Sequence, residues 1–173
     1  MMTDIIIRQA TTSDLDILCQ LGKETFHETF AESNTAENMS KYLEINFTDE
    51  KVKTELNNPD SIFFIAWEGS EAVGYLKLNF GMAQTEPHDE NALEIERIYV
   101  KSVYHGKKVG QLLYEKALEI AVMKKSSYLW LGVWEENARA IRFYEKNEFV
   151  AFDKHIFRMG EDEQTDIMMK KRL

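Results

Sequence analysis

The sequence contains a single cysteine, Cys19, among its 173 residues, so no disulfide bond can form within the chain. Such scarcity is typical of proteins that stay in a reducing cytosol. Leu15, Leu18 and Leu21 surround the cysteine in sequence, which favours a small buried apolar side chain over a reactive thiol. We therefore expect a cytoplasmic protein without structural disulfides.

Long apolar runs and metal-ligand patterns are also missing. No stretch is long enough to span a bilayer, and the N-terminus, MMTDIIIRQ, has an early acid and a short apolar run, unlike a secretory signal. The four histidines, His27, His88, His105 and His155, do not have metal-ligand spacing. Because no repeat, low-complexity segment or linker interrupts the chain, we expect one domain over residues 1–173, with no membrane and no metal.

The chain has fewer basic than acidic residues: 21 Lys and Arg and 30 Asp and Glu give a net charge of −9. This balance argues against nucleic acid as a partner and would favour the approach of a cationic substrate. Acidity also serves solubility alone in many proteins. The apolar content of 44% and charged content of 29% fit a soluble globular domain with a sizeable core.

Hydrophobic periodicity and capping residues predict strands and helices that alternate along the chain. The expected strands cover residues 5–8, 61–67, 71–80, 93–100, 128–133, 149–157 and 164–170. The expected helices cover residues 15–30, about 35–47, 48–57, 109–125 and 137–144. A polar loop is expected over 81–91 and an acidic turn over 159–163. The strand–helix–strand unit implies a parallel pair, so the sequence predicts one α/β domain with a mixed sheet.

The segment LEIERIYV, residues 93–100, has the alternation of a strand. Its period of two predicts Glu94, Glu96 and Ile98 on one face, with the intervening residues on the other. Two carboxylates would then stand on one side of an otherwise interior strand, where they could take part in acid–base chemistry.

A basic turn with two glycines follows this strand. Gly106 and Gly110 flank Lys107 and Lys108 just before a helical pattern begins. A turn of this kind presents unpaired backbone N–H groups and the positive end of a helix dipole, a site for a phosphate or diphosphate. Alternatively, the glycines serve only the turn itself.

Three acids of the first helix, Glu24, Glu28 and Glu32, recur every four residues and share one helical face. They form either a solvated surface or an acidic wall for a polycation.

Several motifs occur in a fixed order: ERIYV, HGKKVGQLL, LGVWEENARAIRFY and EKNEF. Together they resemble the GNAT superfamily of acyl-CoA-dependent N-acetyltransferases. The segments ETF…TF, LGVWE and MG-x-x-EQTD are similar to the PaiA-type spermidine/spermine N-acetyltransferases within it. The resemblance implies an α/β (α+β) domain with a mixed, mostly antiparallel central sheet, in which helices flank a splayed parallel pair. It is compatible with a homodimer.

The resemblance also implies acetyl-CoA as co-substrate, with its pantetheine lying between the splayed strands. The residues implied in binding it are Ile98, Tyr99 and Val100 by their backbone, the phosphate loop His105, Gly106, Lys107, Lys108, Val109 and Gly110, and Asn137, Tyr144 and Lys146. Three positions depart from the family pattern. His105 replaces a Gln or Arg, while Lys108 and Glu148 replace glycines. A lysine at position 108 can still offer its backbone N–H if its conformation is helical. We expect Asn147 to take the left-handed position that ends the helix.

Acetyl transfer to an amine needs a base, because an ammonium with a pKa of about 10.4 is not a nucleophile. By resemblance, Glu96 is the first choice for the base and Glu94 the second. The backbone N–H of Ile98 would polarise the carbonyl. Tyr144 resembles the acid that protonates the departing thiolate, although a core role would also explain it. Asn137 resembles a carrier-binding asparagine, although a helix cap would also explain it.

Three functions remain open at this point. The first is acetylation of a small cationic amine such as spermidine or spermine by direct attack in a ternary complex. Acids that could hold its other ammonium groups are Glu24, Glu28, Glu86, Glu135 and Glu136. The second is acetylation of protein N-termini or lysines. The third is a CoA-binding regulatory module in which Lys108 and Glu148 weaken catalysis. An acyl-cysteine intermediate is disfavoured, since no activating histidine accompanies Cys19.

Overall fold

The computed structural model describes residues 4–86 and 89–173. Its β-strands are β1 (Ile5–Gln9), β2 (Ser61–Glu68), β3 (Glu71–Asn79), β4 (Ala92–Val100), β5 (Tyr128–Trp134), β6 (Val150–Met159) and β7 (Asp162–Arg172). Its α-helices are α1 (Leu15–Phe30), α2 (Ala36–Asn46), α3 (Asp49–Asn57), α4 (Val109–Met123) and α5 (Ala138–Lys146). These elements confirm the expected strands and helices. The last turn is shorter than expected, at residues 160 and 161, and His88 of the predicted polar loop lies outside the described residues.

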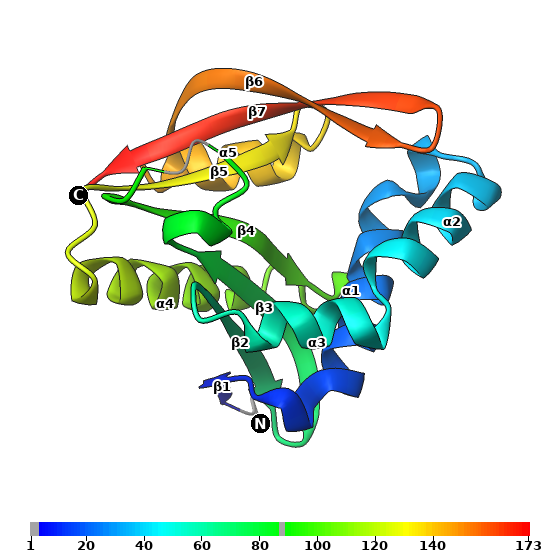
Figure 1. Cartoon of the computed structure of the whole chain (residues 1–173), viewed down its shortest axis with the longest axis horizontal. Coiled ribbons are helices and arrows are strands. Elements are labelled where there is room, and N and C mark those ends of the chain that lie inside the picture. The colour runs from blue at the N-terminus through cyan, green and yellow to red at the C-terminus, as the bar shows by residue number, and fades with distance from the viewer. Residues whose placement is uncertain (1–3, 87–88) are drawn as a thin grey trace.

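All seven of these strands form one sheet, in the order β1-β2-β3-β4-β5-β7-β6 (Figure 1). Every neighbouring pair is antiparallel except β4 and β5, which are parallel. Helices α4 and α5 cover one face, and α1 and α3 cover the other. The mixed α/β sheet predicted from the sequence is thereby confirmed.

The apolar side chains gather into separate cores on the two faces. The largest lies between the sheet and helices α4 and α5, with Leu76, Leu93 and Leu113 fully buried. A second lies under α1 and α3 and contains Cys19, which confirms that this thiol is buried. Its burial, with a contribution from Asp49, raises the pKa of Cys19 to about 11. A thiol in this environment is a core side chain and not a nucleophile.

The parallel pair separates partway along its length. β4 and β5 pair only over Ala92–Ile95 and Tyr128–Leu131, although the two strands continue to Val100 and Trp134. Beyond that point the edge of β4 that faces β5 has no strand partner, so its backbone groups are free for another ligand. This confirms the splayed parallel pair.

A β-bulge interrupts the pairing of β3 with β4. Lys77 lies opposite Arg97 while Leu78 lies opposite Ile95, so Glu96 is an extra residue on β4. Glu96 therefore faces Lys77 and the α3 side, whereas Ile98 packs into the core beneath α4. The prediction that Glu96 and Ile98 share a face is wrong, because the bulge shifts the alternation by one residue.

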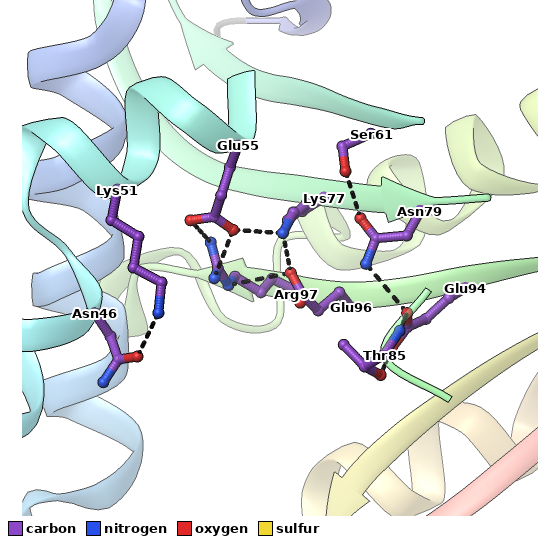
Figure 2. A network of polar contacts seen from close by, with 10 residues as sticks. All are labelled: Asn46, Lys51, Glu55, Ser61, Lys77, Asn79, Thr85, Glu94, Glu96 and Arg97. Atoms are coloured by element: carbon purple, nitrogen blue, oxygen red, sulfur yellow. Dashed lines mark hydrogen bonds and ion pairs between the residues drawn. The ribbon is translucent and has the colours of Figure 1, made fainter. Parts of the chain in front are cut away.

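An ion network holds α3 against this bulge (Figure 2). Lys77 Nζ pairs with Glu55 of α3 and lies 2.5 Å from Glu96 Oε2. Arg97 lies 2.9 Å from Glu55 and 3.6 Å from Glu96. Burial acts to raise the pKa of Glu96, but Arg97 and Lys77 outweigh it and hold that pKa below its ordinary value. Glu96 is thus ionised and engaged within the protein.

Replacing Lys77 by Met should destabilise the fold by about 3 kcal/mol, because two largely buried carboxylates would lose one of the two cations that they share. Urea unfolding measures this free energy. Lys41→Met is the matched control, since Lys41 forms an exposed ion pair with Glu37, and it should change stability by less than about 0.5 kcal/mol. Equal effects of the two substitutions would contradict the structural role given to the network.

Candidate active site

A cleft of about 1500 Å³ follows the gap between β4 and β5. One end lies at the start of α4 and along α5, and the other is enclosed by α1, α2 and the β6–β7 hairpin. The cleft brings together nearly all residues predicted from the sequence: Glu94, Glu96, Ile98, Tyr99, Val100, His105, Gly106, Lys108, Val109, Gly110, Asn137, Tyr144 and Lys146. Lys107 is not among the lining residues, and its ammonium lies 5.1 Å from the centre of the Tyr104 ring.

The N-terminus of α4 opens into this cleft. Its first backbone hydrogen bond runs from Leu112 N to Lys108 O, and no side chain caps the helix. The N–H groups of the first turn of α4 are therefore available to an anion, and a Cβ built at Gly110 would meet only Val100 Cγ2, at 4.0 Å. Lys108 is left-handed, with φ 65° and ψ 14°, so it does not adopt the helical conformation considered from the sequence. This end of the cleft fits the diphosphate of an extended carrier.

His105 ties the turn to the end of β4. Its Nε2 donates a hydrogen bond to the carbonyl of Val100 at 2.9 Å. Further basic residues line the same end of the cleft, namely Lys108, Arg139, Arg142 and Lys146. The phosphate end is therefore cationic, although the protein as a whole is acidic.

Asn137 begins α5 and faces the cleft. Its Oδ1 accepts a hydrogen bond from Ala140 N at 3.2 Å, which confirms the capping role considered from the sequence. Its position in the lining also leaves it beside any bound carrier.

Tyr144 lies in α5, where it belongs to the core and also lines the cleft. The ring is 7% exposed and packs 5.4 Å from Phe143 and 5.6 Å from Phe149 between ring centres. Burial raises the pKa of Tyr144, so the hydroxyl keeps its proton. Among the described residues it has no hydrogen-bond partner, which leaves the hydroxyl free to donate to a ligand.

Glu148 adopts the left-handed conformation that ends α5, with φ 72°, while Asn147 has φ −91°. The expectation for Asn147 is therefore wrong by one position. Phe149 N bonds to Tyr144 O and Glu148 N to Glu145 O, the pattern of a helix end whose left-handed residue follows the cap. Asn147 instead exchanges hydrogen bonds with Gln111 of α4 at 3.2 and 3.3 Å.

Glu94 is a buried carboxylate that lines the cleft, and Figure 2 shows its contacts with Asn79 and Thr85. It is 3% exposed and accepts hydrogen bonds from Thr85 N, Thr85 Oγ1 and Asn79 Nδ2 at 2.8, 2.6 and 3.1 Å. Burial raises the pKa of Glu94 in spite of these bonds. The neighbouring carboxylates Glu94 and Glu96 therefore have pKa values shifted in opposite directions, which is typical of sites that perform acid–base chemistry.

The far half of the cleft is aromatic and acidic. Its rings are Phe26, Phe30, Tyr42, Phe47, Trp134 and Phe157. Glu28, Glu86 and Glu136 line the cleft as well, whereas Glu24 and Glu135 do not. Glu28 accepts a hydrogen bond from Ser102 N at 3.2 Å, so this acid also anchors α1 beside the end of β4.

Sequence reasoning assigned no role to Asp166, which lines the cleft from β7 opposite Trp134 of β5. The only signal was its place at the end of the EQTD segment. Pairing of distant strands brings it into the site.

Two further searches cover the described residues alone. In residues 4–86 and 89–173, no three or more His, Cys, Asp or Glu side chains gather as a metal site would require. In the same part of the chain, no helix is both long and apolar enough to cross a bilayer.

Comparison with known proteins extends these observations. The acetyltransferase (GNAT) family matches residues 23–149. A protein of Lactobacillus delbrueckii subsp. lactis, described as an uncharacterized N-acetyltransferase in the pepI 3′ region, is 40% identical over 99% of both chains. A spermidine N(1)-acetyltransferase of Thermoplasma acidophilum is 27% identical over 97% of each.

A solved structure adds the ligand to this likeness. The crystal structure of PaiA N-acetyltransferase from Thermoplasma acidophilum in complex with coenzyme A superposes with a TM-score of 0.81 at 26% identity. It covers 98% of this chain and 99% of that one. With the family match over most of the chain, and a fold shared with a protein solved in complex with coenzyme A, the protein belongs to the acetyltransferase (GNAT) family and is an acetyl-CoA-dependent N-acetyltransferase.

Proposed function

We propose that the protein acetylates a small polyamine, such as spermidine or spermine, in the cytoplasm. The distribution of charge along the cleft is the observation that carries this proposal. Basic side chains outnumber the single acid Glu115 at the phosphate end. In the other half, aromatic rings and carboxylates line the cleft, and its cations include Lys51 and Arg97, the latter paired with Glu55 and Glu96. An anionic carrier and a cationic amine would each meet complementary charge. The likeness to a spermidine N(1)-acetyltransferase supports the same substrate class.

The base that removes the ammonium proton is one of the two β4 carboxylates. Glu96, the first choice from the sequence, is weakened as a base by its ion pairs with Lys77 and Arg97. Glu94 has a raised pKa, closer to the operating pH, and no cation beside it in the network of Figure 2. We therefore assign the proton transfer to Glu94, directly or through one water, and an orienting electrostatic role to Glu96.

The remaining steps use groups on either side of the gap. Acetyl-CoA supplies the acetyl group as a thioester. The unpaired edge of β4 at Ile98 offers a backbone N–H to the carbonyl oxygen as negative charge develops there. The Tyr144 hydroxyl donates its proton to the departing sulfur. Cys19 is buried outside the cleft, so transfer is direct within a ternary complex and no acyl-enzyme forms.

The left-handed conformations of Lys108 and Glu148 bear on the alternative of a regulatory CoA-binding module. Both residues keep the backbone shape for which glycine is usually chosen. The presence of Lys108 and Glu148 in place of glycine therefore gives no reason for lost catalysis, and this favours an active enzyme over a CoA sensor.

An acceptor panel tests the proposed function. Release of free CoA thiol should depend on the added amine and should be faster with spermidine or spermine than with a basic peptide. Preference for the peptide would favour a protein acetyltransferase. Binding of acetyl-CoA without amine-dependent turnover would favour the regulatory module.

Tyr144→Phe should lower kcat by about 100-fold, the size typical of losing a general acid. The KM for acetyl-CoA should stay within about threefold, since the packing of the ring is retained. Steady-state kinetics measure both. Tyr128→Phe is the control, because its hydroxyl only bonds Asp89 at 2.9 Å outside the cleft. An unchanged kcat in Tyr144→Phe would exclude the acid role.

The pH dependence of kcat/KM separates the two carboxylates. A base must be ionised, so the raised pKa of Glu94 should place the acidic fall of kcat/KM above the ordinary glutamate pKa of about 4.3. Glu94→Gln should remove this limb and lower kcat/KM by about 100-fold. Glu96→Gln should retain the limb. The opposite pattern would assign the base to Glu96.

A further inference from the structure

We infer that Asp166 binds a second ammonium group of the acceptor, and so makes the enzyme prefer amines that carry two or more positive charges. This inference rests on the proposed function and extends it to a residue to which no role has been assigned.

The position of Asp166 gives it access to a ligand. It lies on β7 between Trp134 of β5 and His155 of β6, and it lines the acceptor half of the cleft. The exposed Gly132 of β5 lies beside it, since a Cβ built there would be in van der Waals contact with Asp166 Oδ2, at 3.5 Å; without a side chain, Gly132 leaves that side of the carboxylate uncovered. Gly132 is also the first β5 residue beyond the region paired with β4. The carboxylate therefore faces the gap where the strands have parted.

No residue among those that the structure describes forms an ion pair with the carboxylate of Asp166. Neither a hydrogen bond nor an ion pair within 4.0 Å engages its side chain there, in contrast to Glu94 and Glu96. His155 lies opposite in the strand register, but its Nδ1 is 3.4 Å from Glu86. Burial raises the pKa of Asp166, and His155 only partly opposes this. A ligand cation would offset the cost of leaving this carboxylate half-buried.

The surroundings suit the carbon chain of such a cation. Trp134 is fixed by a hydrogen bond from its Nε1 to Gln164 Oε1 at 2.8 Å, and its ring lies 5.0 Å from that of Phe30. Phe157 lies 5.9 Å from Phe30 and 5.7 Å from Tyr42. Aromatic faces of this kind pack against methylene groups and attract ammonium groups. An alkyl chain with an ammonium at its end therefore matches this half of the cleft.

The test compares acceptors with different numbers of positive charges, and the diamine and the monoamine have the same carbon chain. Spermidine, α,ω-diaminooctane and octylamine are assayed with the full-length enzyme and its Asp166→Asn variant. The variant should raise KM for both polyamine-like acceptors by about 10- to 100-fold, the loss typical of a charge-assisted hydrogen bond. Its kcat/KM for octylamine and its KM for acetyl-CoA should change less than about twofold, which also shows that the variant is folded.

Two further variants sharpen the comparison. Asp153→Asn removes the same charge from an exposed residue of β6 outside the cleft and should leave all three acceptors unaffected. Gly132→Ala places a methyl group in front of Asp166 and should reduce the preference for the diamine over octylamine.

Two results would overturn the inference. In one, Asp166→Asn leaves the preference for spermidine unchanged. In the other, it lowers kcat equally for octylamine and the diamine, as loss of a base would. If the wild-type enzyme acetylates none of these amines, the proposed function itself fails.

Discussion

Hydrogen bonding between β4 and β5 ends at Ile95 and Leu131, and the rest of the site depends on that interruption. A strand edge without a neighbour leaves backbone donors and acceptors that must find other partners. Helix α4 begins shortly after the same strand and adds its own unpaired N–H groups. One continuous segment therefore supplies both an unpaired extended edge and an uncapped helix start, the two features we assign to the carrier and its phosphates.

A strand that parts from one neighbour must be held firmly by the other. β3 and β4 approach so closely that a Cβ at Gly74 would stand 2.8 Å from the carbonyl oxygen of Tyr99. The bulge at Glu96 turns that carboxylate toward Lys77, and Arg97 joins both to α3 through Glu55 (Figure 2). The charges of this network thus serve to fix the shape of β4. Glu94, one pleat away, is not part of this network and is the carboxylate we propose as the base.

Much of the fold could be predicted from periodicity, because the strands and helices carry clear patterns and caps. The parallel pair followed from the strand–helix–strand order, and the splay followed from resemblance. The bulge could not be predicted, since LEIERIYV alternates without a break and the irregularity arises from pairing with Lys77 and Leu78. The helix end at Glu148 was missed by one residue for a similar reason, because composition favours Asn147. Asp166 and Gly132 become neighbours only when β7 pairs with β5.

Lys108 and Glu148 hold left-handed conformations without being glycine. For residues with a Cβ this conformation costs about 1 kcal/mol, yet the unfolded chain has fewer conformations to lose than it would with glycine. This conformational free energy is already included in the folding of the protein, so it does not have to be supplied when the carrier binds. The turn ahead of α4 is consequently preorganised, and little ordering entropy should remain to be lost when the diphosphate binds.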